Sequence, residues 1–263
     1  MKNKALLVGI NKYPNPSNEL RGCVNDINDM IRFISDTNDV YKKEHILTLT
    51  DKYATKKAIV ANLNWLIEDA QAGDQLLFHY SGHGAQANTM NKKEEVDGKD
   101  EIICPYDFDW TTETTLRDKE FAEIFKKIPK GVHFVWISDS CHAEDLSREV
   151  IDSNQRTHSS YRIFTGEQKP ILVPSKWSFC SKEPVFKGAL LSACESHQLS
   201  ADAYIDNRFN GAFTHYLLKN LRKSGNEKTM QELIHNVHSD LLMNGYDQRP
   251  QFEGPLCNSK FFI

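Results

Sequence analysis

The 263-residue sequence lacks the features of several specialised protein classes. It has only 9 proline and 13 glycine residues, too few for a collagen-like or a proline- and glycine-rich disordered chain. The early apolar run Ala5–Ile10 is shorter than the roughly 7–15 residues of a signal-peptide core, and no stretch reaches the roughly 18 apolar residues of a membrane span. We therefore expect a soluble globular protein of the cytoplasm that has no membrane partner.

An excess of basic residues is also absent. Lysine and arginine number 32 against 36 acidic residues, which gives a net charge of −4. A general nucleic-acid binder would carry a basic surface, so we expect no nucleic-acid partner.

Cysteine pairs of the CxxC type are missing, which excludes zinc-ribbon and thioredoxin-type motifs. Without such pairs or a signal peptide, the cysteines are expected to be reduced thiols, as is usual in the cytoplasm. They are Cys23, Cys104, Cys141, Cys180, Cys194 and Cys257.

The sequence does contain an alternation of short apolar runs with amphipathic stretches. The apolar runs predict strands at residues 4–10, 45–50, 74–80, 133–138 and 188–193. Helical periodicity predicts helices at residues 25–35, after a cap at Thr55, at 212–221 and at 229–243. Strands separated by helices need crossover connections, so the pattern predicts an α/β fold with a mostly parallel central sheet and helices on both faces.

Two segments interrupt this alternation. Ala85–Lys99 is polar and charged, and Cys141–Lys187 has few periodic signals. Irregular stretches of such length are usually functional loops or linkers. Both begin within two residues of the positions of greatest chemical interest.

Those positions are His83 and Cys141, each of which closely follows a predicted strand. Ligands gather at the carboxyl ends of parallel strands, so we expect both side chains at one edge of the sheet. A thiol and an imidazole placed there can act as nucleophile and base. The neighbouring Gly84 offers a backbone N–H to the oxyanion that forms during acyl transfer.

Other roles for these residues stay open on the sequence alone. Taken singly, such a histidine or cysteine is more often structural. A metal site of His83, Cys141 and His142 is disfavoured, because His142 should point away from its neighbour and no fourth ligand has a suitable spacing. We therefore expect no metal here.

The stretches Tyr-Ser-Gly-His-Gly, ending at Gly84, and Asp-Ser-Cys-His, ending at His142, resemble the metacaspase branch of the caspase-like cysteine peptidases, including its compact orthocaspase-like bacterial members. The histidine precedes the cysteine by 141 − 83 = 58 residues, similar to the spacing in caspases. Further matches lie at residues 5–11, 20–26, 103–108, 211–214 and 250–254. The resemblance implies a caspase–hemoglobinase fold and peptide-bond hydrolysis by a dyad of His83 and Cys141.

The same resemblance implies a substrate pocket formed by Cys23, Asp26, Ser81 and Asp139. Two carboxylates beside the nucleophile favour a cationic side chain, so we expect cleavage after arginine or lysine and not after aspartate. As an alternative, the Asp26 carboxylate only stabilises the start of a helix and Asp139 only holds a loop.

Calcium is the point at which the resemblance breaks down. Many metacaspases bind calcium with acids that follow the Pro-Tyr-Asp-Phe segment and the Cys-His pair. Here the first region has Lys119 in place of an acid, and Arg148 stands seven residues after Cys141. Calcium takes roughly six to eight oxygen ligands and would be repelled by two added cations, so we expect an enzyme that needs neither calcium nor another cofactor.

The segment after Cys141 has the position of the family's linker between large and small subunits. The resemblance divides a single peptidase domain, residues 1–263, into a large-subunit-like region 1–147, a linker 148–186 and a small-subunit-like region 187–263. An enzyme specific for basic residues can cut itself in such a linker; an uncut, ordered loop is the alternative. The candidate cleavage sites are Arg148, Arg156, Arg162, Lys169 and Lys176.

We expect the chain to work as a monomer on protein or peptide substrates. The main alternative is a catalytically silent caspase-like binding or scaffold module, which the intact His83 and Cys141 pair disfavours. A legumain-type hydrolase is a further alternative, but such enzymes are secreted or lysosomal and the sequence shows no signal peptide.

Overall fold

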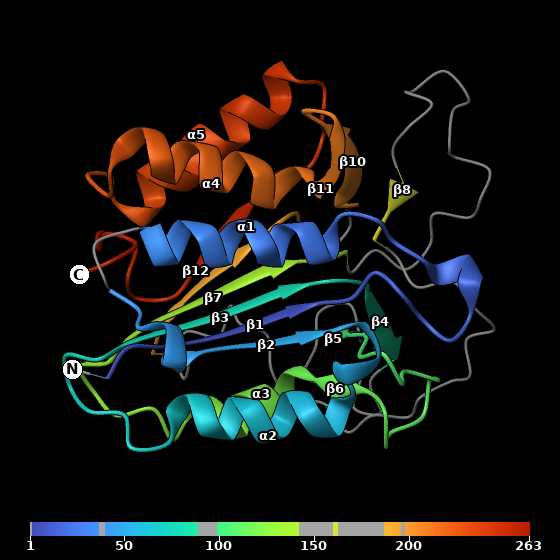
Figure 1. Cartoon of the computed structure of the whole chain (residues 1–263), viewed down its shortest axis with the longest axis horizontal. Coiled ribbons are helices and arrows are strands. Elements are labelled where there is room, and N and C mark those ends of the chain that lie inside the picture. Colours follow the sequence, from blue (N-terminus) through green and yellow to red (C-terminus); the bar gives the residue numbers. More distant parts are fainter. Residues whose placement is uncertain (1, 37–39, 89–98, 142–159, 163–186, 196–197) are drawn as a thin grey trace.

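A six-stranded sheet forms the centre of the computed structural model, which describes residues 2–36, 40–88, 99–141, 160–162, 187–195 and 198–263 (Figure 1). Its strands follow the order β12-β9-β7-β3-β1-β2. They are β1 (Lys4–Gly9), β2 (Ile46–Thr50), β3 (Gln75–Ser81), β7 (His133–Asp139), β9 (Ala189–Ser192) and β12 (Gln251–Glu253). Neighbours from β2 to β9 pair in parallel, and β12 pairs antiparallel with β9. The predicted α/β fold with a mostly parallel sheet is confirmed.

All five predicted strands lie in this sheet, and their observed ends differ from the predicted ones by at most one residue. Their continuous apolar runs have a physical cause, because a parallel sheet is covered on both faces and each strand must be apolar on both sides. Strand β12 was not predicted. It contains only three residues and no apolar run.

Helices cover both faces of the sheet (Figure 1). Helices α1 (Cys23–Asp36), α4 (Ala212–Ser224) and α5 (Met230–Met243) lie on one face, and α2 (Lys56–Ile67) and α3 (Asp118–Phe125) lie on the other. Successive side chains of β1 point alternately to the two faces of the sheet. Leu6 and Val8 belong to the apolar core under α2 and α3, whereas Ala5 and Leu7 belong to the core under α1, α4 and α5. Each fully buried leucine or valine contributes about 1.5–3 kcal/mol through removal of apolar surface from water.

Local sequence explains several helix ends. The Thr55 hydroxyl accepts a hydrogen bond from the Ala58 N–H (3.3 Å), which confirms the predicted cap of α2. Thr229 and Glu232 form a reciprocal capping box at the start of α5. Gly225 follows α4 with a φ of 57°, a left-handed conformation in which glycine carries no steric penalty. Short 3-10 helices lie in three connections: η1 (Pro16–Asn18), η2 (Lys43–His45) and η3 (Asp51–Tyr53).

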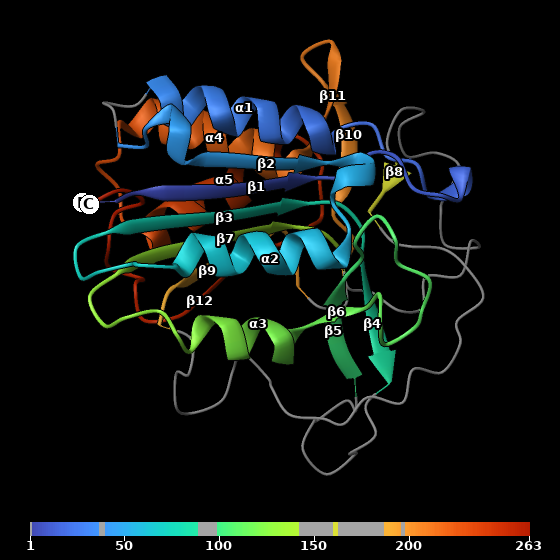
Figure 2. The same ribbon diagram turned by 60° about the horizontal axis from the view of Figure 1, so that its bottom comes forward.

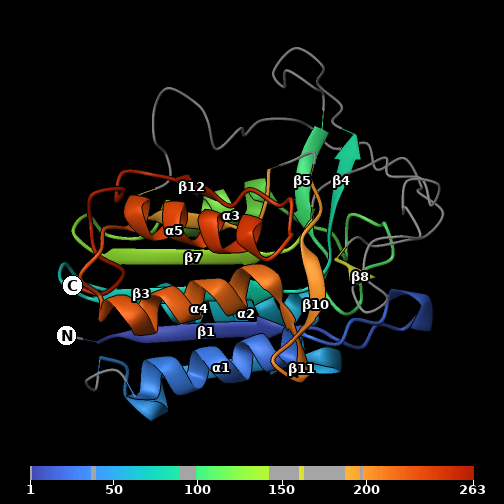
Figure 3. The same ribbon diagram turned by 90° about the horizontal axis from the view of Figure 1, so that it is seen from above.

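Two small sheets stand at the carboxyl end of the central sheet, away from both chain termini (Figures 2 and 3). One contains β4 (Gly84–Asn88), β5 (Lys99–Ile103) and β6 (Leu116–Arg117), and the other contains β8 (Ser160–Tyr161), β10 (Ala201–Ile205) and β11 (Arg208–Gly211). The prediction that Ala85–Lys99 is irregular is therefore wrong at both ends, where backbone pairing of β4 with β5 imposes extended structure on a polar sequence. Likewise, β8 lies inside the segment expected to be an irregular linker.

Within the described residues, no helix is long and apolar enough to cross a membrane.

Candidate active site

The site begins where β3 and β7 end side by side. Ser81 pairs with Asp139 at the last register position of the two strands, and the Gly82 N–H donates to the Asp139 carbonyl oxygen (3.3 Å). His83 and Cys141 each follow two residues later, at the same edge, and both are buried. The structure thus brings the two residues to the one sheet edge expected from the strand pattern.

The His83 ring is held by a backbone carbonyl. Its Nε2 atom lies 2.7 Å from the carbonyl oxygen of Asn18, at the end of η1. A carbonyl oxygen only accepts, so Nε2 carries the hydrogen and Nδ1 is the basic atom of the neutral ring. Burial lowers the pKa of His83 to about 4, although the nearby backbone of Asn18 and of Arg162 raises it. At neutral pH the ring is therefore uncharged and able to accept a proton.

The Cys141 sulfur is positioned by the residue that precedes β10. Its Sγ atom accepts a hydrogen bond from the Ser200 N–H (2.7 Å) and donates to the Ser200 carbonyl oxygen (3.3 Å). These contacts place the thiol between the end of β7 and the start of β10.

Residues 160–162 lie along β10 as an added strand. Ser160 and Tyr161 pair antiparallel with Asp202 and Ala201, and the Arg162 N–H donates to the Ser200 carbonyl oxygen (3.2 Å). The Arg162 carbonyl oxygen in turn accepts from the Gly84 N–H (3.3 Å). Extended peptides bind to many proteins through such edge pairing. The chain thus presents a carbonyl group of its own to the N–H that the sequence analysis assigned to the oxyanion.

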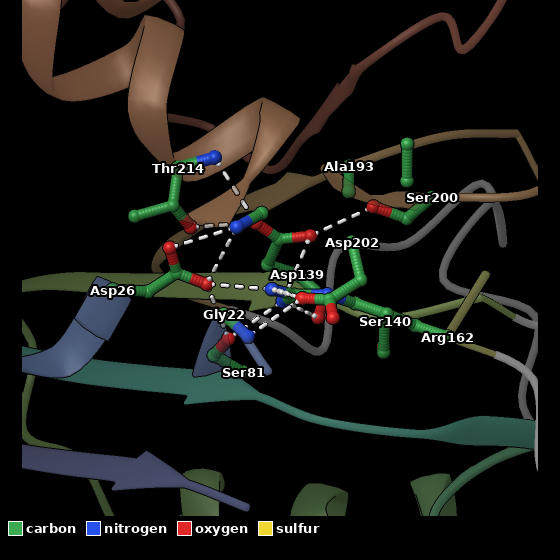
Figure 4. Close-up of polar contacts among 12 residues, drawn as sticks. Gly22, Asp26, Ser81, Asp139, Ser140, Arg162, Ala193, Ser200, Asp202 and Thr214 are labelled. Carbon is green, nitrogen blue, oxygen red and sulfur yellow. Dashed lines mark hydrogen bonds and ion pairs between the residues drawn. The ribbon is translucent and has the colours of Figure 1, made fainter. Parts of the chain in front are cut away.

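The Arg162 side chain fills a fully buried pocket (Figure 4). Its Nη1 atom donates to the Ser81 hydroxyl (2.6 Å) and to the Asp139 carbonyl oxygen (3.0 Å), and lies 3.3 Å from the Asp139 carboxylate. Its Nη2 atom contacts the carboxylates of Asp26 (2.7 Å) and Asp202 (3.2 Å). One guanidinium group therefore meets three carboxylates.

Neutral donors from several elements hold the Asp26 carboxylate. The Ser81 hydroxyl donates to Oδ2 (2.7 Å), whereas the Asn210 side-chain amide (3.0 Å) and the Gly211 N–H (2.9 Å) donate to Oδ1. Burial raises the pKa of Asp26 to about 7, because the loss of water outweighs the attraction of Arg162.

The other two carboxylates are anchored in the same way. Asp139 accepts from the Ser200 hydroxyl (2.7 Å) and from the N–H (3.0 Å) and hydroxyl (2.6 Å) of Thr214, in the first turn of α4. A helix N-terminus favours a negative charge. Asp202 accepts from the N–H groups of Arg21 (2.8 Å) and Gly22 (2.9 Å), which precede α1.

Gly211 leaves room for the guanidinium group. A Cβ atom at this position would lie 2.2 Å from an Asp139 carboxylate oxygen and 2.6 Å from Arg162 Nη2. Any other residue at 211 would therefore compete with the arginine for space. The pocket has the shape and charge to hold an extended cationic side chain.

Comparison with known proteins identifies the family. The model of the metacaspase, peptidase C14 domain matches residues 3–149. The chain belongs to the metacaspase family. It is 31% identical over 286 residues to Metacaspase-1 of Pyricularia oryzae, a match that covers 95% of this chain and 71% of the relative. It is 30% identical over 301 residues to Metacaspase-1B of Neurospora crassa, with 100% and 69% covered.

Solved structures agree on the fold. A crystal structure of a Geobacter sulfurreducens protein superposes with a TM-score of 0.74 at 24% identity and covers 100% of this metacaspase and 99% of that chain. Caspase-1 from Spodoptera frugiperda superposes with a TM-score of 0.64 at 12% identity, with 96% and 86% covered. The predicted membership of the metacaspases is confirmed, and this metacaspase is a cysteine-type peptidase that acts on proteins or peptides.

The four residues expected in the pocket of the metacaspase lie together. Asp26, Ser81 and Asp139 contact Arg162 directly, and the buried Cys23 begins α1, in the same first turn as Asp26. Burial raises the pKa of the Cys23 thiol well above its usual value, so this group is a neutral part of the wall.

Asp202 was missed by the sequence analysis. It stands between two alanines in β10, and a carboxylate in such an apolar setting signals a buried charge that needs a partner. Its partner in space comes from a segment about 40 residues away in the sequence, so no local pattern could have identified the pair.

Four of the candidate cleavage sites, namely Arg148, Arg156, Lys169 and Lys176, lie outside the described residues, as does His142.

In the region that follows the Pro-Tyr-Asp-Phe segment of this metacaspase, Glu120 is paired with basic side chains. The Glu120 carboxylate lies 3.0 Å from Lys56 Nζ and 3.8 Å from Arg117 Nε, so two cations already neutralise it. Across the described part of the chain, no group of three or more histidine, cysteine or acidic side chains is arranged to hold a metal ion. The side chains of Lys119 and Arg148 lie outside that part.

Replacement of Asp202 tests its part in substrate binding. The Asp202→Asn variant keeps an acceptor for the Gly22 N–H but loses the negative charge. We expect kcat/KM for an arginine-ended fluorogenic peptide to fall roughly 10- to 100-fold, because a hydrogen bond to a charged group is worth about 1.5–3 kcal/mol. The exposed Asp206→Asn variant, in the turn of the same hairpin, serves as control and should retain the wild-type value. Equal kcat/KM values in both variants would contradict a binding role for Asp202.

Proposed function

We propose that this metacaspase cleaves peptide bonds on the carboxyl side of arginine or lysine, with Cys141 as nucleophile and His83 as general base. One observation carries the proposal. The Arg162 guanidinium lies among three buried carboxylates while the carbonyl group of the same residue accepts from the Gly84 N–H (3.3 Å). A bound substrate would place the carbonyl of its scissile bond at that position.

The arrangement supports a covalent mechanism. His83 Nδ1 takes the Cys141 proton, and the sulfur attacks the carbonyl carbon while the carbonyl electron pair moves to oxygen. The Gly84 N–H stabilises the resulting oxyanion. The imidazolium then gives its proton to the leaving amine, the C–N bond breaks and a thioester remains. Water, deprotonated by His83, attacks the thioester and releases the acid and the thiol.

Charge supports the preference for basic residues. The guanidinium lies 2.7–3.3 Å from the carboxylates of Asp26, Asp139 and Asp202. Burial lowers the pKa of Arg162, but these carboxylates raise it well above its usual value. An aspartate side chain in this pocket would add a fourth negative charge without a partner. Burial of an uncompensated charge is costly, so such substrates should be rejected.

The proposal is tested with peptides that end in arginine, lysine or aspartate before a fluorogenic group. We expect hydrolysis of the arginine and lysine peptides only. The Cys141→Ala variant should lose activity by a factor on the order of 10³ or more, since the nucleophile is removed. The matched Cys257→Ala variant should keep it, because Cys257 is half-buried and its backbone contacts Gln231 at the start of α5 and not the catalytic edge of the sheet.

Faster hydrolysis of the aspartate peptide would contradict the specificity. The alternative of a catalytically silent binding module predicts no hydrolysis of any peptide and no labelling of Cys141 by an arginyl chloromethyl ketone.

Self-processing is part of the proposal. Of the five basic residues considered in the linker, Arg162 has its side chain in the carboxylate pocket and its carbonyl group at Gly84. The carbonyl group of Arg162 is thus presented as that of a substrate residue would be. The match between the Arg162 charge and the three carboxylates explains why this arginine is fully buried.

Purified wild-type protein should accordingly yield a fragment that begins with the sequence Ile-Phe-Thr, at Ile163. Removal of the cationic side chain in Arg162→Gln should abolish this cut, as should Cys141→Ala. The Arg156→Gln variant removes another linker arginine and should leave the cut unchanged. Denaturing gels and N-terminal sequencing measure the result, and an intact chain in wild type under active conditions would contradict self-cleavage at Arg162.

Calcium independence is also proposed. The ion pairs of Glu120 with Lys56 and Arg117 support it, because they place two cations next to an acid that calcium would need. Hydrolysis of the arginine peptide should proceed at the same rate in excess EDTA and in millimolar calcium. Loss of activity in EDTA that calcium restores would show the opposite.

The expectations of a monomer, a cytoplasmic location, and the absence of nucleic-acid and membrane partners stay predictions. Strand β12 offers support for the monomer, since it covers the β9 edge of the sheet with a short strand of three residues.

A further inference from the structure

A second cysteine lies beside the proposed nucleophile. Strands β7 and β9 are parallel neighbours, with Ser138 opposite Ser192, and the Ala193 N–H donates to the Ser138 carbonyl oxygen (3.0 Å). Cys194 is the next residue after Ala193, so it leaves the sheet next to the segment that carries Cys141. Figure 4 labels Ser140 and Ala193, which precede Cys141 and Cys194 in the chain, and Ser200, whose backbone contacts the Cys141 sulfur.

The Cys194 side chain points to the segment that carries the nucleophile. Its Sγ atom lies 3.7 Å from the carbonyl oxygen of Ser140, the residue before Cys141, and 3.4 Å from that of Gln198. The neighbouring Cys141 thiol, together with burial, raises the pKa of the Cys194 thiol well above its usual value, so Cys194 stays protonated.

The other described cysteines occupy different places. Cys23 begins α1 beside Asp26 of the carboxylate pocket, and Cys104 is part of the core on the α2 and α3 face. Cys257 is only half-buried. Among the described thiols, Cys194 is thus the one that lies against the backbone next to Cys141.

We propose that Cys194 is a resolving thiol, which forms a disulfide with Cys141 when a hydroperoxide oxidises the nucleophile. In the first step the Cys141 thiolate attacks one peroxide oxygen, the O–O bond breaks and hydroxide leaves, which gives a sulfenic acid. In the second step the Cys194 sulfur attacks the Cys141 sulfur, the S–O bond breaks, and the departing hydroxide takes the Cys194 proton as water. The two thiols lose two electrons and the peroxide is reduced.

The disulfide gives the site a reversible inactive state. A thiol reductant restores both cysteines, whereas a sulfenic acid without a resolving thiol proceeds to sulfinic and sulfonic acids, which thiols do not reduce. The loss of peptidase activity on oxidation rests on the proposed role of Cys141; the disulfide itself does not.

Mass spectrometry and recovery of activity test the proposal on the full chain. Wild-type protein is treated with hydrogen peroxide, its free thiols are alkylated, and it is digested without reductant. We expect a linked peptide pair that contains Cys141 and Cys194, with a mass about 2 Da below the sum of the two reduced peptides. Activity on the arginine peptide should be lost and then regained with dithiothreitol. In Cys194→Ala the same loss of activity is expected. The fraction of activity that dithiothreitol restores should be at most roughly one fifth of that in the wild type, because Cys141 is over-oxidised.

Cys257→Ala serves as the matched control and should behave like the wild type. The absence of a linked pair, a Cys141 link to Cys23 instead, or full recovery in Cys194→Ala would each overturn the proposal. If Cys194→Ala does not fold, the recovery of activity is measured in Cys194→Ser instead. The presence or absence of the linked peptide pair in the wild type then tests the disulfide without any variant. A linked pair in a protein that hydrolyses none of the peptides would leave the disulfide standing and refute the proposed function.

Discussion

Three buried carboxylates set the main constraint on this molecule. A carboxylate removed from water must be matched by hydrogen-bond donors or by a cation, because the free energy of burying an unpaired charge is comparable to the whole stability of a folded domain. Asp26, Asp139 and Asp202 meet this condition with donors drawn from the segment before α1, from β3, from the β10–β11 hairpin and from the first turn of α4. Elements from both ends of the chain therefore have to assemble before the pocket exists.

The neutral donors supply no positive charge to the three carboxylates, whereas the guanidinium of Arg162 does. Each carboxylate keeps an oxygen directed to the space that the Arg162 side chain fills. The pocket is thus organised for a cation before any substrate arrives, so that the protein does not have to reorganise its dipoles during binding. Residues 160–162 occupy the edge of β10 while the Arg162 side chain occupies the pocket. Under the proposed function this arginine competes with substrate.

The chemistry at the other end of the pocket depends on strand register. Ser81 and Asp139 are paired at the ends of β3 and β7, so the two residues that follow each strand leave the sheet side by side. A slip of one residue would turn Asp139 to the opposite face and separate it from Thr214. The parallel pairing of β9 with β7 brings Cys194 to the same corner by the same geometry.

The sequence by itself determined five of the six strands of the central sheet, four of the helices, the family and the positions of His83 and Cys141, because these follow from apolar runs, periodicity and short motifs that are local in the chain. It also placed Asp26 and Asp139 near each other through the resemblance. It did not identify the pairing of β4 with β5, helix α3, Asp202, or which of five basic linker residues enters the pocket. Only the tertiary structure decided these. Strand pairing of polar segments and the partners of buried charges depend on groups that are distant in sequence, and a single sequence carries no signal of that proximity.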